Sequence, residues 1–290
     1  MSRAPFRERL AESAATRGSF LCVGLDPDPE QIPPSLGAGI SAVRRHTLAV
    51  IEATAPYAAA YKPNAAFFEQ FGAPGWELLI EVVGVARQHA PVILDAKRGD
   101  IGSTAAAYAR AVFDVIGADA CTVNPYLGGD SLEPFLSRPD RFTFILCRTS
   151  NPGARDLQDL LIEGRGGEPL YLAVGRCAVE WNVAGNVGLV AGATWAAEIS
   201  RLRTVAPDMP ILLPGIGRQG GDLREAILAA RGPSGRGEYL ASASRGISQA
   251  STGDDFAEAA GAAARDLAGQ LRQLAQIQVS PEEPVPPTQE

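Results

Sequence analysis

Charged side chains follow an apolar run in the stretch PVILDAKRGD, residues 91–100. Side chains of a strand alternate between its two faces, so Asp95 and Lys97 are expected to lie on the same side. A lysine flanked by the carboxylates of Asp95 and Asp100 is held protonated and in a fixed position, which suits a general acid. A salt bridge and a helix cap, where Ser103 and Thr104 open an Ala-rich helix, explain the same residues without chemistry.

A second lysine favours the chemical interpretation. Lys62, in the stretch YKPN, comes at the end of the preceding predicted strand. Adjacent parallel strands lie about 5 Å apart, so the Lys62 ammonium is expected to join the cluster. An alternating array of Lys62, Asp95, Lys97 and Asp100 is hard to explain by stability alone, because buried charge networks are often no more stabilising than apolar packing.

Short apolar runs alternate with longer amphipathic segments, and such runs are typical of parallel strands covered on both faces. The predicted strands are residues 20–26, 58–64, 91–97, 120–125, 142–148, 187–192, 210–217 and 239–247. Predicted helices between them include residues 42–57, 76–90, 103–117 and 194–207. Eight strands, each followed by helical material, predict an α/β fold, a (β/α)8 TIM barrel in a single domain. A doubly wound open sheet is the main alternative.

Polar residues stand at the carboxyl ends of the predicted strands: Asp26, Lys62, Asp95, Lys97, Asn124, Arg148 and Arg245. In a barrel these ends meet on one face, where the active sites of such folds are built. We expect one catalytic domain over residues 1–275 and a disordered Pro- and Glu-rich tail over 276–290. The Gly-rich segment 151–170 is predicted to be a long loop with a short helix, mobile over the mouth.

Composition favours some functions over others. A net charge of −7 argues weakly against nucleic acid as the partner, because broad phosphate binding requires a basic face. His46 and His89 fall in helical segments and no pattern of metal ligands occurs, so we expect no metal. The N-terminus lacks the apolar region of a signal peptide, and no run approaches the ~20 apolar residues of a membrane span. Four cysteines without a CxxC motif complete the expectation of a soluble cytoplasmic protein with reduced thiols.

The motif D-x-K-x-x-D-I-x-x-T, here residues 95–104, resembles the signature of the orotidine 5′-phosphate decarboxylase family. Other stretches resemble the longer bacterial branch of that family. They are GLDPDP, KPN, RTSNPGA, PGIGRQGGD and SRGI, at or after the first, second, fifth, seventh and eighth predicted strands. The resemblance covers roughly residues 18–265.

This resemblance implies decarboxylation of orotidine 5′-monophosphate to UMP in de novo pyrimidine biosynthesis, without a metal or an organic cofactor. Fixed charges must then stabilise electrons at C6 that the ring π system cannot delocalise. Lys97 is implied as the proton donor to C6, Asp95 as the group that orients it, and Lys62 as a ligand of a ribose hydroxyl. Asp100 and Thr104 are implied to complete the neighbouring subunit's site at the ribose 2′-hydroxyl, in a homodimer with shared sites.

The resemblance also implies residues that bind the rest of the substrate. Asp26 corresponds to a ligand of the ribose 3′-hydroxyl, although DPDPE also has the composition of a turn. Ser150 corresponds to a serine that hydrogen-bonds the pyrimidine edge. Phosphate is expected at the loops after the seventh and eighth strands, where glycine N–H groups and an arginine can bind an anion. The residues assigned there are Gly217, Gln219, Arg245 and Gly246.

Two other functions stay open on the sequence. A magnesium-dependent sugar-phosphate decarboxylase or aldol-type synthase shares the DxKxxD motif. Those relatives carry a carboxylate metal ligand at the end of the second strand, where this chain has Lys62. A non-catalytic sensor of nucleotide monophosphates is the second alternative, and binding alone would not require so many facing charges.

Overall fold

Eight parallel strands form the centre of the structure, a computed structural model in which residues 4–216 and 223–277 are described. The strands are β1 (Leu21–Leu25), β2 (Ala60–Pro63), β3 (Ile93–Arg98), β4 (Ala120–Val123), β5 (Phe142–Arg148), β8 (Val187–Ala191), β9 (Ile211–Pro214) and β10 (Tyr239–Ala243). Their order in the sheet is β2-β1-β10-β9-β8-β5-β4-β3. Parallel bridges from Tyr61 to Val92 and from Asn64 to Asp95 join β2 to β3. The sheet therefore closes into the predicted barrel, and the open doubly wound sheet is excluded.

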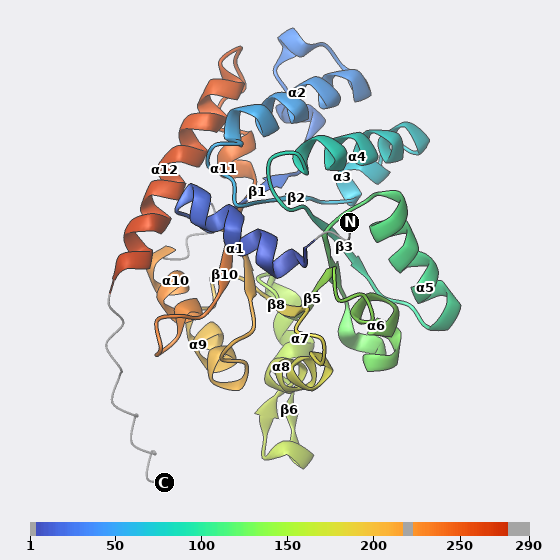
Figure 1. Ribbon diagram of the computed structural model, residues 1–290, viewed down its shortest axis with the longest axis vertical. Helices are drawn as coiled ribbons and strands as arrows, with labels where there is room; N and C mark the ends of the chain where they lie inside the picture. Colours follow the sequence, from blue (N-terminus) through green and yellow to red (C-terminus); the bar gives the residue numbers. More distant parts are fainter. Residues whose placement is uncertain (1–3, 217–222, 278–290) are drawn as a thin grey trace.

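Helices cover the outer face of this barrel (Figure 1). They are α2 (Gly39–Thr54), α3 (Ala66–Glu69), α4 (Ala73–Ala86), α5 (Gly102–Arg110), α6 (Gly129–Leu136), α8 (Leu170–Trp181), α9 (Ala196–Val205), α10 (Leu223–Arg231), α11 (Arg245–Ser248) and α12 (Phe256–Gln276). Outward-facing strand residues such as Val23, Leu94 and Leu189 are fully buried in the apolar layer that these helices complete. Each such side chain contributes about 1.5–3 kcal/mol on burial, which explains the near-continuous apolar runs.

Alternate strand residues fill the inside of the barrel. The apolar cluster there comprises Cys22, Ala60, Ile93, Ala120, Phe142, Phe144, Val190, Leu212 and Leu240 from the strands. Two residues further along four of these strands, the same inward face carries Lys62, Asp95, Thr122 and Ser242. Apolar packing thus gives way to polar side chains toward the carboxyl ends of the strands.

Helix α1 (Phe6–Arg17) closes the amino-terminal end of the barrel (Figure 1). Phe6 and Leu10 lie one turn apart on the same face of the helix, and both are buried in the interior cluster. The ring centroid of Phe6 is 5.0 Å from that of Phe142 and 6.2 Å from that of Phe144. The carboxyl ends of the strands are therefore the open end of the barrel.

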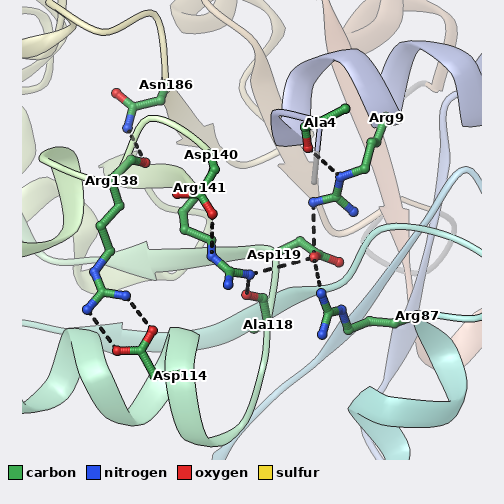
Figure 2. Close-up of polar contacts among 10 residues, drawn as sticks. All are labelled: Ala4, Arg9, Arg87, Asp114, Ala118, Asp119, Arg138, Asp140, Arg141 and Asn186. Carbon is green, nitrogen blue, oxygen red and sulfur yellow. Dashed lines mark hydrogen bonds and ion pairs between the residues drawn. The ribbon is translucent and has the colours of Figure 1, made fainter. Parts of the chain in front are cut away.

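A buried ion network fixes the same closed end (Figure 2). Asp119 directly precedes β4, and its fully buried carboxylate accepts a hydrogen bond at Oδ2 from the N–H of Val92, at 2.9 Å. Its Oδ1 lies 3.0 Å from Arg9 Nη2, 3.1 Å from Arg87 Nη2 and 3.9 Å from Arg141 Nη1. The network ties α1 and the segment after α4 to the starts of β3, β4 and β5. In a barrel, polar groups at this end serve stability.

The segment after β5 contains more secondary structure than predicted. The short helix expected within residues 151–170 is α7 (Arg155–Gln158). It is followed by a two-stranded antiparallel hairpin of β6 (Leu161–Ile162) and β7 (Glu168–Pro169), which projects from the barrel at the bottom of the view in Figure 1. The sequence pattern missed this hairpin because strands of two residues are too short to show alternation.

The structure corrects the end of the last predicted strand. The predicted strand 239–247 is too long, because β10 ends at Ala243 and helix α11 begins at Arg245. Residues 217–222 and 278–290 lie outside the described residues, so disorder of the Pro- and Glu-rich tail stays a prediction. Among the helices of the described ranges, none has the length and apolar character needed to cross a membrane.

Candidate active site

Asp95 lies between two lysines at the carboxyl ends of β2 and β3. Its Oδ2 is 2.9 Å from Lys62 Nζ, and its Oδ1 is 2.6 Å from Lys97 Nζ. The Lys62 and Asp95 side chains are 6% and 12% exposed, whereas the Lys97 side chain is 48% exposed. The structure therefore brings together three of the four predicted catalytic residues, with Lys97 the most accessible of them.

The buried pair of Asp95 and Lys62 stays charged. Burial opposes the charge of the Asp95 carboxylate, but the ammonium groups of Lys62 and Lys97 outweigh it and hold the pKa of Asp95 well below its usual range. Burial also opposes the charge of Lys62, and the carboxylates of Asp95 and Asp26 outweigh it, so the pKa of Lys62 is raised well above its usual range. At neutral pH the site thus presents one carboxylate held between two ammonium groups, which favours an anionic ligand.

The backbone of β3 is irregular where it carries the array. Pairing of β3 with β4 shifts between Leu94 and Arg98. Within that interval Lys97 adopts a left-handed conformation with φ 48°, the one positive φ of a non-glycine residue in the described ranges. Bulges and strained residues of this kind often redirect a side chain beside an active site. Here the irregularity turns the Lys97 side chain back onto Asp95.

A cavity of ≈ 190 Å³ opens beside this array. Five predicted site residues line it: Asp26, Lys62, Ser150, Arg245 and Gly246. The rest of its wall comes from Pro214, Gly215, Ile216, Ser242 and Ser244. The carboxyl ends of β1, β2, β5, β9 and β10 therefore converge on one space, as the barrel prediction required.

Two buried oxygen atoms at this cavity have no hydrogen-bond partner in the part of the chain that the structure describes. Asp26, which directly follows β1, has its Oδ1 buried with no hydrogen-bond partner among the described residues. The hydroxyl of Ser244, directly after β10, is also buried and has no hydrogen-bond partner among those residues. Buried polar atoms in proteins are normally hydrogen-bonded, so the Asp26 oxygen suits a hydroxyl group of a ligand, and the Ser244 hydroxyl suits a hydroxyl or a phosphate group.

The loop after β5 holds Ser150 against the cavity. The carbonyl of Thr149 accepts a hydrogen bond from Trp195 Nε1 at 3.0 Å, and its N–H donates to Gln158 Oε1 at 2.9 Å. Gly192 allows the close approach of this loop to the end of β8, because a Cβ there would lie 2.8 Å from the Cβ of Ser150. Side chains from α7 and from the start of α9 thus fix the position of Ser150.

Arg148 ends β5 as predicted, but it is not among the residues that line the cavity. Its side chain is 1% exposed, and the guanidinium lies 4.4 Å from the ring centroid of Trp195. Its Nη1 is 2.9 Å from Asp159 Oδ1, and its Nη2 is 3.8 Å from Glu198 Oε1. Arg148 therefore anchors the loop that carries Ser150 instead of facing a ligand.

Asp100 and Thr104 lie apart from the array, around the start of α5. Asp100 Oδ1 accepts a hydrogen bond from the N–H of Ile101 at 2.8 Å, and Thr104 is exposed. Ile101 beside them is 59% exposed. Within the described ranges Asp100 forms no ion pair with either Lys62 or Lys97. A single chain therefore does not assemble the predicted array of four residues.

The predicted phosphate site is only partly described. Arg245 and Gly246 begin α11 immediately after Ser244 and line the cavity. Gly217 and Gln219 lie outside the described residues. Within those residues no group of three or more His, Cys, Asp or Glu side chains could hold a metal ion.

Sequence reasoning missed three polar residues of this end of the barrel, and each left a signal. Thr122 and Ser242 occupy inward positions of predicted strands, where polar residues are unexpected unless they serve a site. Ser244 is the first residue of the stretch SRGI, next to the predicted Arg245.

A (β/α)8 barrel with a charge cluster and a cavity at the carboxyl ends of its strands has the architecture of a barrel enzyme. Residues 19–261 match the orotidine 5′-phosphate decarboxylase / HUMPS family. The chain belongs to this family.

Individual relatives agree with this assignment. The orotidine 5′-phosphate decarboxylase of Thermomicrobium roseum is 49% identical over 270 residues, which cover 93% of this chain and 95% of the relative. That of Roseiflexus sp. (strain RS-1) is 51% identical over 269 residues, covering 92% and 96%. The solved structure of Leishmania donovani OMP decarboxylase has a TM-score of 0.82 and 42% identity, covering 94% of this chain and 100% of that chain. The family resemblance of the 95–104 motif is thereby confirmed.

Proposed function

We propose that this protein is an orotidine 5′-phosphate decarboxylase, which converts orotidine 5′-monophosphate to UMP and carbon dioxide in pyrimidine biosynthesis. The observation that carries the proposal is Asp95, held between Lys62 and Lys97 beside a cavity at the barrel mouth. Family membership supports the same reaction, because relatives that are 49% and 51% identical to this chain carry that name. The reaction uses neither a metal nor an organic cofactor.

Lys97 is the proposed proton donor. When the bond between C6 and the carboxylate breaks, carbon dioxide leaves and the electron pair stays in an sp² orbital at C6. The Lys97 ammonium stabilises this charge electrostatically and then transfers a proton to C6, which gives UMP. Its side chain is 48% exposed, against 6% for Lys62, which makes it the more accessible lysine of the pair.

Asp95, Lys62 and Asp26 support this step. Asp95 orients the Lys97 ammonium at 2.6 Å and fixes the direction of the proton transfer. Lys62 holds the other carboxylate oxygen and reaches a ribose hydroxyl. Asp26 Oδ1, which is buried and has no partner within the described ranges, accepts a hydrogen bond from the ribose 3′-hydroxyl.

The other parts of the substrate lie along the cavity. Ser150 hydrogen-bonds the pyrimidine edge from the loop after β5, at one wall of the cavity. Arg245 and Gly246, with Gly217 and Gln219, bind the phosphate at the loops after β9 and β10. Remote phosphate binding serves catalysis when it organises the groups that surround the reacting carbon.

Asp100 and Thr104 complete the site of a second subunit in a homodimer. Thr104 is exposed and Asp100 is half-buried beside the exposed Ile101, which supports a role on a partner surface. Asp100 supplies the second carboxylate of the Lys–Asp–Lys–Asp array, and Thr104 contacts the ribose 2′-hydroxyl. We also place the enzyme in the cytoplasm, which its four free thiols support.

A magnesium-dependent reaction on the same scaffold is the alternative. The buried Lys62 ammonium at the end of β2 disfavours a cation in this position, because like charges in a buried site repel. A nucleotide sensor without activity is the other alternative.

Absorbance spectroscopy tests the proposal, because orotidine 5′-monophosphate and UMP absorb differently in the ultraviolet. We expect the purified protein to convert the substrate at the same rate with and without EDTA. Loss of activity in EDTA that magnesium restores would favour the metal-dependent alternative. Binding of UMP without any turnover of the substrate would favour the sensor.

A further inference from the structure

The interruption between β3 and β4 leaves a backbone group that the ladder of the sheet does not pair. β3 advances from Leu94 to Arg98 while β4 advances only from Cys121 to Val123. Lys97 lies inside this interval, in the left-handed conformation that side chains disfavour. Its N–H therefore needs an acceptor outside the ladder, since backbone N–H groups of folded proteins are nearly always hydrogen-bonded.

Thr122 supplies that acceptor and also contacts the catalytic carboxylate. The N–H of Lys97 donates to Thr122 Oγ1 at 3.0 Å, and the Thr122 hydroxyl donates to Asp95 Oδ1 at 2.8 Å. The directions are fixed, because an amide N–H can only donate and a carboxylate can only accept. Thr122 is 1% exposed, so it acts on its neighbours and not on a ligand.

We propose that Thr122 is a positioning residue for the decarboxylation. Its hydroxyl joins the strained backbone of Lys97 to the carboxylate of Asp95, and so sets the proton donor and its orienting group relative to each other. The inference rests on the proposed function and extends it, since it holds that a residue of the neighbouring strand β4 sets the geometry of the array. A misplacement of about 1 Å at such a donor is enough to slow a reaction by about 100-fold.

The chain offers a rescue variant and a matched control. Thr122→Val keeps the shape of the side chain and removes the hydroxyl, whereas Thr122→Ser keeps the hydroxyl. Thr143 is also fully buried, in β5, and its hydroxyl has no partner among the described residues. Thr143→Val is therefore the same chemical change in a barrel strand without the link to the array.

Steady-state kinetics with orotidine 5′-monophosphate and titration with UMP give the readouts. We expect Thr122→Val to lower kcat by about 10- to 100-fold, because it removes a hydrogen bond to a charged group, while the Kd for UMP changes less than about threefold. Thr122→Ser and Thr143→Val should stay within about threefold of wild-type kcat. If the role of Thr122 were purely structural, kcat and the affinity for UMP would fall together, and Thr122→Val and Thr122→Ser would have similar effects.

Wild-type kcat in Thr122→Val, or an equal loss in Thr122→Ser, would overturn the role of Thr122. If Thr122→Val does not fold, a crystal structure of the wild-type enzyme with UMP decides. It should show Thr122 Oγ1 bonded to both the Lys97 N–H and Asp95, and loss of either contact would overturn the inference. A wild-type enzyme inert toward orotidine 5′-monophosphate would instead overturn the proposed function.

Discussion

Lys97 and Arg98 are neighbours in β3 with different partners, so they form a matched pair of variants. Lys97 Nζ contacts Asp95, whereas Arg98 Nη2 lies 2.6 Å from Glu69 Oε1, and its guanidinium is 5.1 Å from the ring centroid of Tyr108. Lys97→Ala should lower kcat by about 10³-fold or more, because the proton donor and its charge are lost together. Arg98→Ala should keep kcat within about threefold.

Two measurements separate chemistry from binding in this pair. Stopped or continuous assays give kcat, and calorimetric titration gives the Kd for UMP. Lys97→Ala should still bind UMP. A wild-type kcat in Lys97→Ala would show that Lys97 is not the proton donor. An equal loss of kcat in Arg98→Ala would show that the loss in Lys97→Ala comes from general damage to β3.

At the residue scale, the sequence predicted that Lys62, Asp95 and Lys97 lie together, as they do in the structure, but it predicted their geometry less well. Alternation placed Asp95 and Lys97 on one side of a strand, and the structure does bring their charged groups together. The reason differs, because a bulge and a positive φ break the alternation at Lys97. Thr122 could not be assigned from sequence, since its link to Asp95 depends on the register between two strands.

The loop after β5 shows how neighbouring elements position a binding residue. Trp195 precedes α9 and donates from Nε1 to the carbonyl of Thr149, next to Ser150. The same ring lies under the Arg148 guanidinium at 4.4 Å. The loop that carries Ser150, a proposed substrate contact, is therefore held by Trp195, which is not among the described residues that line the cavity.

Trp195→Phe tests this arrangement, because it keeps an aromatic ring and removes the hydrogen-bond donor. The loop carrying Ser150 should become less well positioned, and we expect KM to rise about 3- to 10-fold with kcat within about twofold. Trp181→Phe, the same exchange at the end of α8, is the control and should leave both constants unchanged. An unaltered KM in Trp195→Phe, or equal effects in both variants, would contradict the role of this contact.

At the element scale, the eight barrel strands were predictable and the insertions were not. Predicted strands such as 142–148 coincide with β5, because a run buried on both faces is apolar throughout. The β6–β7 hairpin has only two residues per strand. Helix α11 begins at Arg245, within the residues that the sequence assigned to the last strand. Short elements of this kind are set by their tertiary contacts, which leave little periodic signal.

At the scale of the whole molecule, the two ends of the barrel differ: buried stabilising contacts lie at the closed end, and the candidate site lies at the open end. At the closed end, Phe6 fills the interior and the buried Asp119 is surrounded by arginines (Figure 2). At the open end, Asp95 carries the same kind of buried charge, but its partner Lys97 is half exposed and the cavity lies beside it. The fold itself could be predicted from the strand count, whereas the subunit arrangement could not, because nothing in strand periodicity describes a partner.

The central claim is that a site combines Lys97 of one chain with Asp100 of another. Lys97→Ala and Asp100→Ala should each be nearly inactive as homodimers. In a mixed dimer, one of the two sites takes Lys97 from the Asp100 variant and Asp100 from the Lys97 variant, and so regains every native group.

Co-expression of the two variants, followed by assay of orotidine 5′-monophosphate turnover, measures this recovery directly. Random pairing makes half of the dimers mixed, and one site of each is native, so activity should return to about a quarter of the wild-type value. A mixture that stays as inactive as either variant alone would contradict the account.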